Sequence, residues 1–333
     1  MRIFLVLLMI AVFAFADAFD DGMAAGKQGN YEDAIEQFTQ AIKQNTNHAM
    51  TYYNRGISYA NISDHSKAVE DFTQAIKINP NNAEIYKNRG ASYAKLGDRL
   101  KPIEDYAQAI KINPYDAQAY SSLGFLYANV GNHSTAIANY AQAIRINPND
   151  AQVYKDRGIS YAKLDDHSKA IKDFTQAIKF NPNNAEIYKD RGISYANISD
   201  RSKAIEDFTQ AIKLNPNYAE AYYNRANSFC DFSEYSKAIS DYVRAIQLNP
   251  NYAEAYYNRG LMYEELGEHS RAIKDFSQAI KIDPNNADVY NSRGGLYAHL
   301  SDYEKAALDA HKACDLGDCG LLQLMVKNGR IHD

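Results

Sequence analysis

An interval of 34 residues separates equivalent positions along almost the whole chain. Alanine recurs nine times at this spacing without a gap, and seven of the eight prolines keep the same spacing. The alanines are Ala41, Ala75, Ala109, Ala143, Ala177, Ala211, Ala245, Ala279 and Ala313, and the prolines are Pro80, Pro114, Pro148, Pro182, Pro216, Pro250 and Pro284. A fixed period of this size predicts a stack of similar structural units rather than one globular core. It leaves no segment for a separate catalytic domain, so we expect a protein that is not an enzyme.

Each period contains two helical patterns, as residues 83–116 illustrate. In the first half, Tyr86, Gly90 and Tyr93 recur at helical spacing. A glycine then interrupts the pattern, and Asp98 is placed to cap a second helix. The second half has its own apolar helical face, which an Asn-Pro pair ends. Each repeat is therefore predicted to be a helix, a tight turn, a second helix and a proline-marked exit.

Three further rows of residues keep the period and predict how the two helices pack. Glycine recurs in the middle of the first helix, although glycine inside a helix costs about 1 kcal/mol relative to alanine. We therefore expect another backbone to lie close to these glycines, which are Gly56, Gly90, Gly124, Gly158, Gly192, Gly260 and Gly294, with Ala226 as the exception. Aromatic residues are expected to fill the space between the helices. They are Tyr52, Tyr86, Tyr120, Tyr154, Tyr188, Tyr222, Tyr256 and Tyr290 in first helices, and Phe38, Phe72, Tyr106, Tyr140, Phe174, Phe208, Tyr242 and Phe276 in second helices.

This order of aromatic, glycine, alanine and proline positions resembles the tetratricopeptide repeat, or TPR. The resemblance covers nearly all of the chain after its first residues, with tyrosine where the repeat usually has tryptophan. It implies an all-α fold, a right-handed α-solenoid (TPR superhelix) of about nine antiparallel helix pairs. It also implies that the first helices line the concave face, and that this groove binds a peptide or a partner protein.

The period also gives the expected domain boundaries. Residues 1–18 are expected to be a signal peptide, residues 19–320 the TPR array, and residues 321–333 a C-terminal cap and tail. The expected repeats cover about 19–48, 49–82, 83–116, 117–150, 151–184, 185–218, 219–252, 253–286 and 287–320.

Three places depart from the regular repeat. The first repeat keeps only the later part of its first helix, about Phe19 to Gln28. Leu321 to Lys327 is expected to form a short capping helix, because a solenoid needs its apolar end covered. Pro102 falls in the first turn of a second helix, so this helix is expected to start late or loosely.

The first residues have the pattern of a secretory signal peptide. Arg2 precedes an apolar run over residues 3–15, and small residues around Ala16 provide a cleavage site. As a helix the run would span roughly 20 Å, which is short of a bilayer core of about 30 Å. We expect an exported protein, periplasmic or extracellular, with no membrane span after cleavage. An uncleaved anchor is the alternative.

The three cysteines fit an exported protein without requiring a disulfide. Cys230 falls at a core-edge position of a helix, where a small apolar residue is usual. Cys314 and Cys319 would point about 140° apart on one continuous helix. They could form a disulfide only if that helix ends at Gly317.

Charged residues are mixed along the chain. The net charge is −5, from 36 basic and 41 acidic residues, and no basic stripe suggests nucleic acid as a partner. Seven repeats have an arginine with an aspartate sixteen residues later, and two repeats lack both. This shared absence predicts an ion pair between the two helices of one repeat, while common ancestry of similar repeats is the alternative explanation. The pairs are Arg55–Asp71, Arg89–Asp105, Arg157–Asp173, Arg191–Asp207, Arg225–Asp241, Arg259–Asp275 and Arg293–Asp309.

No residue pattern in the sequence predicts chemistry. Histidine recurs at one repeat position, at the expected start of a second helix, in His65, His133, His167 and His269. Equivalent positions of stacked helix pairs lie roughly 20 Å apart, whereas zinc ligands lie about 2 Å from the metal. We predict no metal site, no cofactor and no catalytic residue. A redox or metal protein that uses Cys314 and Cys319 is a remote alternative.

The resemblance implies that partner-binding residues project from the first helices on either side of the glycine. These positions hold Tyr53, Ile57, Lys87, Phe125, Lys155, Ile159, Lys189, Ile193, Tyr223, Asn227, Tyr257 and Leu261. Lysine, tyrosine and apolar residues together suit an extended peptide or an amphipathic helix. The alternative is that these side chains only cover the seams between helices. The expected function is therefore a non-catalytic protein-binding scaffold, and the runner-up is a structural protein that self-associates by stacking end to end.

Overall fold

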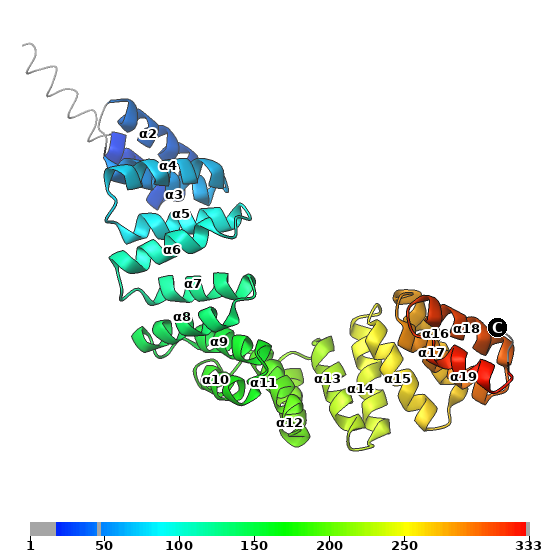
Figure 1. Ribbon diagram of the computed structural model, residues 1–333. Coiled ribbons are helices and arrows are strands. Elements are labelled where there is room, and N and C mark those ends of the chain that lie inside the picture. The colour runs from blue at the N-terminus through cyan, green and yellow to red at the C-terminus, as the bar shows by residue number, and fades with distance from the viewer. Residues whose placement is uncertain (1–17, 45–47, 331–333) are drawn as a thin grey trace, which may run out of the picture. The chain divides into compact units, whose positions relative to one another are not determined.

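The computed structural model describes residues 18–44 and 48–330, and this part of the chain contains helices and no strand (Figure 1). The predicted all-α solenoid of helix pairs is confirmed. Residues 1–17 of the predicted signal peptide lie outside the described residues. None of the described helices is both long enough and apolar enough to cross a membrane.

First and second helices alternate along the chain, as expected from the repeat. The first helices are residues 18–27, α3 (Ala49–Asn61), α5 (Ala83–Lys95), α7 (Ala117–Asn129), α9 (Ala151–Lys163), α11 (Ala185–Asn197), α13 (Ala219–Cys230), α15 (Ala253–Glu265) and α17 (Ala287–His299). The second helices are α2 (Tyr31–Lys43), α4 (His65–Ile78), α6 (Lys101–Ile112), α8 (His133–Ile146), α10 (His167–Phe180), α12 (Arg201–Leu214), α14 (Tyr235–Leu248), α16 (His269–Ile282) and α18 (Tyr303–Asp315). The short helix α19 (Gly320–Lys327) follows them.

The helices form two compact halves, Met1–Asp165 and Asp166–Asp333. In the N-terminal half α3 packs on α4, α5 on α6 and α7 on α8, and each second helix also packs on the next first helix. The C-terminal half has the same arrangement from α11 to α18. Neighbouring first helices contact each other, as α3 with α5 and α11 with α13 do. The first helices therefore line one side of each half, which we call the first-helix face.

Polar turns connect the two helices of a repeat. After α11, Ser199 has a φ of 63°, and the backbone N–H of Asp200 donates to the carbonyl of Tyr195 at 2.9 Å. The Asp200 side chain accepts a hydrogen bond from the N–H of Lys203 at 3.3 Å and so caps α12. The turn thus satisfies backbone groups that both helix ends leave free.

The repeated glycines leave room for an aromatic ring rather than for a backbone. A methyl group added at Gly192 would lie 2.7 Å from Cε1 of Phe208, and one added at Gly56 would lie 2.7 Å from Cε1 of Phe72. At both positions the atoms nearest to the added methyl group belong to the ring and not to a backbone. The ring of the second helix already occupies the space that a side chain would need.

Helix α6 starts late, as Pro102 predicts. It begins at Lys101 and has 12 residues, whereas each of the other second helices from α4 to α16 has 14. Pro102 lies in its first turn and is buried. Asp98, which was expected to cap this helix, accepts hydrogen bonds at 3.0 Å from the N–H groups of Leu100 and Lys101. The chain is therefore held in a bent segment just before α6.

The predicted cap over Leu321 to Lys327 is confirmed as α19. In the last repeat Ala310 replaces the aromatic residue of the second helix, and Leu321 fills the space. A methyl group added at Gly294 would lie 2.8 Å from Cδ2 of Leu321. Met325 packs beside Ala310 and is only 3% exposed. The cap therefore supplies the apolar volume that the last repeat lacks.

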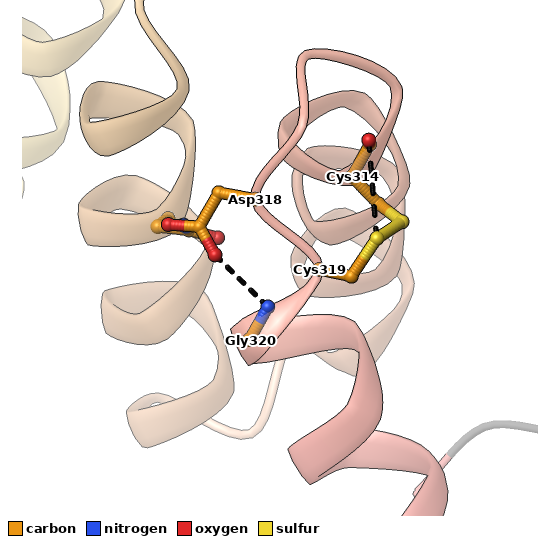
Figure 2. The surroundings of a disulfide bond; sticks show 5 residues. Cys314, Asp318, Cys319 and Gly320 are labelled. Atoms are coloured by element: carbon orange, nitrogen blue, oxygen red, sulfur yellow. Dashed lines mark hydrogen bonds between the residues drawn. A yellow bond between two sulfur atoms is a disulfide. The ribbon is translucent and has the colours of Figure 1, made fainter.

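A disulfide between Cys314 and Cys319 joins the end of α18 to the start of α19 (Figure 2). Helix α18 ends one residue after Cys314, and Gly317 has a φ of 103°. The helix thus ends just before Gly317, which is the condition under which the sequence allowed Cys314 and Cys319 to form a disulfide. Between them, Asp318 accepts a hydrogen bond from Nδ2 of Asn291 at 2.6 Å, which ties the turn to α17.

Candidate functional site

The repeated arginine forms a bidentate ion pair inside the array. Nε and Nη2 of Arg191 donate to the two carboxylate oxygens of Asp207 at 2.8 and 2.7 Å. The predicted pairing is confirmed in six repeats, by Arg55–Asp71, Arg89–Asp105, Arg191–Asp207, Arg225–Asp241, Arg259–Asp275 and Arg293–Asp309. Arg157 and Asp173 belong to different halves, so the seventh pair stays a prediction.

A hydroxyl group of the preceding repeat completes this arrangement, which the sequence analysis missed. Nη1 of Arg191 donates to Oγ1 of Thr175 at 3.1 Å, and that hydroxyl donates to the carbonyl of Ile171. The same contact is made in other repeats by Thr39, Thr73, Thr209 and Ser277. Each of these residues lies sixteen positions before its arginine, so the sequence carried the signal. The arginine thus links three helices of two successive repeats.

Aromatic rings enclose the guanidinium group on both sides. The Cζ of Arg191 lies 5.8 Å from the ring centres of Tyr188 and Tyr195, which is within cation–π range. Burial lowers the pKa of this guanidinium, but the hydrogen bonds and charge of Asp207 outweigh burial and hold the pKa above its ordinary value. The arginines are therefore charged groups whose guanidinium donors are largely used within the array.

The three predicted groove tyrosines contact the interior as well as the surface. The ring of Tyr223 lies 6.0 Å from that of Tyr242. The hydroxyl of Tyr223 accepts a hydrogen bond from Nδ2 of Asn258 on the next first helix at 3.1 Å. Tyr53 repeats this contact with Asn88 at 3.2 Å. Tyr257 makes the corresponding contact with a serine of α17. These tyrosines join neighbouring first helices, so only part of each ring faces solvent.

Two of the predicted lysines form ion pairs along the first-helix face. The Nζ of Lys87 lies 2.7 Å from Glu84 and 2.6 Å from Asp116, and that of Lys189 lies 2.6 Å from Asp190. Burial lowers the pKa of Lys189, but Asp190 outweighs it and raises the pKa overall. These two lysines are charged and half-buried. The third, Lys155, is also half-buried.

The predicted apolar residues divide between packing and exposure. Ile57 and Leu261 pack against the buried clusters of their own repeats. Both side chains are half-buried. Ile159 and Ile193 are half-buried, whereas the Phe125 side chain is 54% exposed. Phe125 is therefore the most accessible apolar side chain of the predicted groove set.

A hollow of about 210 Å³ opens on the first-helix face of the C-terminal half, between α11 and α13. It brings together Ile193 and Asn227, two of the predicted groove residues, above the ring of Phe208. Asn227 accepts hydrogen bonds from the Tyr242 hydroxyl at 2.6 Å and from the Asn258 amide at 3.1 Å. An ion pair between Arg201 and Asp231 also lines this hollow.

A second hollow of about 460 Å³ opens at the equivalent place in the N-terminal half, between α5 and α7. Phe125 lines it from α7, together with Leu126, Asn129 and Val130. From the α5 side it is lined by Ala94, Gly97, Asp98 and Arg99. Apart from Asn227, the polar residues of both hollows were not predicted from the sequence, because they lie outside the two positions that flank the glycine.

The described histidines and cysteines show no clustered metal ligands. Within residues 18–44 and 48–330, no group of three or more His, Cys, Asp or Glu side chains could hold a metal ion. His65, His133, His167 and His269 are the first residues of α4, α8, α10 and α16. Cys230 is half-buried, with its sulfur 3.2 Å from that of Met262.

Solved structures share the fold at low sequence identity. The C-terminal part of a TPR repeat-containing protein from Cytophaga hutchinsonii is 21% identical, with a TM-score of 0.63 over 71% of this chain and 97% of its own. A tetratricopeptide repeat protein from Parabacteroides merdae is 19% identical, with a TM-score of 0.54 over 75% of this chain and 96% of its own. The Cut9–Hcn1 hetero-tetramer of the APC/C has a chain that is 15% identical, with a TM-score of 0.55 over 93% of this chain and 75% of its own. No curated protein sequence matches the chain significantly.

Family models match most of the repeat array. Two models described as tetratricopeptide repeat match residues 49–82, 151–184 and 253–286, and residues 72–99, 106–138 and 276–307. A model described as TPR repeat matches residues 26–63, 130–165, 201–231 and 226–267. Together they leave only 100–105 and 185–200 unmatched between residues 26 and 307. The chain therefore belongs to the tetratricopeptide repeat family.

Proposed function

We propose that this protein is a non-catalytic scaffold that binds a peptide or a partner protein along its first-helix face. The observation that supports it is a contrast between the interior and that face. The interior arginines are held by aspartate and hydroxyl groups, as Arg191 is by Asp207 and Thr175. The first-helix face has open hollows that contain the predicted groove residues Phe125 and Ile193.

The mixture of groups around these hollows suits a polypeptide ligand. Each hollow has an apolar surface, from Phe125 and Val130 in one and from Phe208 and Ile193 in the other. Each also has polar side chains at its rim, which can orient a backbone or a side chain. An extended peptide or an amphipathic helix presents this combination of groups. The net charge of −5 and the mixed charges disfavour a nucleic acid as the ligand.

We further propose that the protein acts outside the cytoplasm, after removal of a signal peptide near residue 18. The apolar run over residues 3–15 supports export. The Cys314–Cys319 disulfide supports it independently, because disulfides persist in oxidising compartments and are rare in the cytosol.

End-to-end self-assembly is less well supported than partner binding. Stacking would need an apolar surface at the C-terminal end of the array, and α19 covers most of that end while its own Leu324 is 54% exposed. Met325 is buried, and Leu321 and Leu322 pack against α18 and its neighbours. Light scattering of the purified mature protein tests this: a single monomeric mass is expected, and a concentration-dependent mass would favour assembly.

Site-specific photo-crosslinking tests the binding proposal. The photoreactive residue p-benzoylphenylalanine replaces Phe125 or Ile193 on the first-helix face, one position per variant. The matched control replaces Gln74, an exposed residue of the second helix α4. Each variant is expressed in its native host and irradiated in the intact cell.

We expect a crosslinked product of higher mass from at least one first-helix position and none from the Gln74 control. Mass spectrometry should identify a second protein in that product. Equal crosslinking from Gln74 would contradict a binding face. Crosslinks only between copies of this chain would favour the self-assembly alternative.

A further inference from the structure

The two hollows occupy equivalent places three repeats apart, so they can be compared residue by residue. Arg99 in the N-terminal half corresponds to Arg201 in the C-terminal half, and Asn129 corresponds to Asp231. All four residues line their hollows. The comparison isolates one difference: a carboxylate lies opposite the arginine in one hollow, and an amide occupies that position in the other.

In the C-terminal half, the arginine is neutralised within the chain. Nε of Arg201 donates to Oδ2 of Asp231 on the neighbouring first helix. In the N-terminal half, Asn129 has no charge to offer Arg99. Arg99 is exposed and forms no ion pair with any residue in the described part of the chain. The larger hollow therefore has a cation at its rim without the carboxylate that its counterpart has.

The one carboxylate that lines the N-terminal hollow is occupied elsewhere. Asp98 accepts two backbone hydrogen bonds at the start of α6, and its other oxygen lies 3.3 Å from Nζ of Lys101. These backbone bonds lower the pKa of Asp98, so it is ionised at neutral pH. Because Asp98 is paired with Lys101, Arg99 is the charged side chain of the lining that has no counter-charge.

The apolar surface of this hollow is also unusual for the array. Phe125 stands where other repeats have aliphatic, small or amide residues, and its side chain is 54% exposed. Val130 beside it is 42% exposed, and the apolar residues at the same position of other repeats are similarly exposed, so Phe125 carries the difference.

The fourth repeat, which supplies Phe125, is almost free of charge. Between residues 117 and 149 the only Asp, Glu, Lys or Arg is Arg145, on the second helix. This repeat is also one of the two that lack the arginine and the aspartate, with Leu123 and Asn139 in their places. The exposed Phe125 and the arginine before the late-starting α6 both line this one hollow. Packing of the array does not require an exposed phenylalanine or an unpaired arginine there.

We propose that this hollow between α5 and α7 binds an acidic segment of a partner protein. In the bound state an Asp or Glu side chain of the partner pairs with Arg99, as Asp231 pairs with Arg201 within the chain. A bulky apolar side chain next to it covers Phe125 and Val130. The inference rests on the proposed scaffold function and specifies the chemistry of the partner.

Selection from a phage-displayed library of random dodecapeptides tests the proposal with the full-length mature protein. Peptides fused at their C-termini have no free terminal carboxylate, so any carboxylate must come from Asp or Glu. Selection is run in parallel on the wild type and on three variants. Arg99→Gln removes the cation, Asn129→Asp supplies an internal carboxylate, and Arg201→Gln is the matched control in the other hollow. Circular dichroism checks that each variant is folded.

Peptides selected on the wild type are expected to place Asp or Glu beside Phe, Leu, Ile or Trp. Their affinities, measured by fluorescence anisotropy with C-terminally amidated synthetic peptides, should be about fivefold weaker for Arg99→Gln and for Asn129→Asp. Arg201→Gln should bind them as the wild type does. Raising the salt concentration should weaken binding to the wild type more than to Arg99→Gln.

Three results would overturn the proposal. The first is that the selected peptides have no acidic residues, and the second is that neither Arg99→Gln nor Asn129→Asp changes their affinity. Either result would show that peptides bind another part of the first-helix face, while the scaffold function would stand. A failure to select any peptide, together with no crosslinking from Phe125 or Ile193, would contradict the scaffold function as well.

Discussion

Replacement of Arg191 by leucine should destabilise its repeat strongly, and a second replacement at Asp207 should restore most of the loss. Asp207 is 5% exposed and accepts two hydrogen bonds from the guanidinium. The Arg191→Leu variant leaves this carboxylate buried without its partner. Arg191→Leu/Asp207→Asn reproduces the Leu123 and Asn139 pair of the fourth repeat, in which Nδ2 of Asn139 donates to the carbonyl of Thr135 at 2.9 Å.

The expected magnitudes follow from the burial of the pair. Removal of one partner of a fully buried ion pair costs about 3–5 kcal/mol, and exchange of both partners for a well-packed neutral pair is close to neutral. The side chain of Arg191 is 17% exposed, so water can partly solvate the orphaned carboxylate. We therefore expect a loss of about 2–3 kcal/mol for Arg191→Leu and less than about 1 kcal/mol for the double variant.

Native-state hydrogen exchange of α11 and α12 provides the assay, because a repeat array need not unfold in a single step. A loss of about 2 kcal/mol should make amide exchange in these helices roughly thirtyfold faster in Arg191→Leu. Asp207→Asn alone completes the double-mutant cycle, and amides of α17 serve as a distant internal control. Equal losses for Arg191→Leu and for the double variant would refute the pairing argument.

Four further predictions concern single positions of the array. Val243→Thr should raise the free energy of unfolding by about 1 kcal/mol, because Arg259 has no hydroxyl acceptor at that position. Thr209→Val should lower it by a similar amount, because it removes the acceptor of Arg225. Hydrogen exchange of α13 to α16 measures both changes. Gly192→Ala should lower the free energy of unfolding by about 1–2 kcal/mol although alanine has the better helix propensity, because the added methyl group would lie 2.7 Å from the Phe208 ring. An increase in the urea midpoint would show that the ring moves away at little cost. Leu321→Ala should lower the free energy of unfolding by about 1–3 kcal/mol and accelerate amide exchange in α17 and α18 but not in α11. Unchanged exchange in α17 and α18 would mean that the cap does not stabilise the last repeat. Hydrogen bonds from Lys203 hold the pKa of Asp200 below its ordinary value. The stabilisation is therefore present above the ordinary pKa of about 4 and is lost as the pH falls through the lowered pKa. The difference in urea midpoint between the wild type and Asp200→Asn should shrink as the pH falls below about 4, and a difference that does not change with pH would contradict the cause.

The sequence predicted the interior pairs well because two repeats lack both partners at once. Leu123 with Asn139 showed that arginine and aspartate change together, which is the behaviour of contacting residues. The hydroxyl at Thr175 had the same sixteen-residue spacing but was missed, because other repeats replace it by residues such as Val243 without changing the arginine. A contact whose loss is tolerated leaves a weaker pattern in the sequence.

The glycine row and the binding face show where a linear pattern is insufficient. The spacing at Gly192 predicted a close approach, but only the structure identifies the neighbour as the Phe208 ring. The hollow beside Phe125 depends on side chains from two repeats and on the late start of α6. Arg99 and Asn129 are thirty positions apart in the sequence, so neither is a recognisable motif without the fold.

Hydrogen exchange of the complex with the partner recovered by crosslinking tests the central claim most directly. Amides of the first helices that border the hollows, α5 and α7 or α11 and α13, should exchange more slowly when the partner is bound. The exposed second-helix faces, such as that of α4 around Gln74, should be unchanged. Protection centred on second helices, or on the α19 end of the array, would contradict the account.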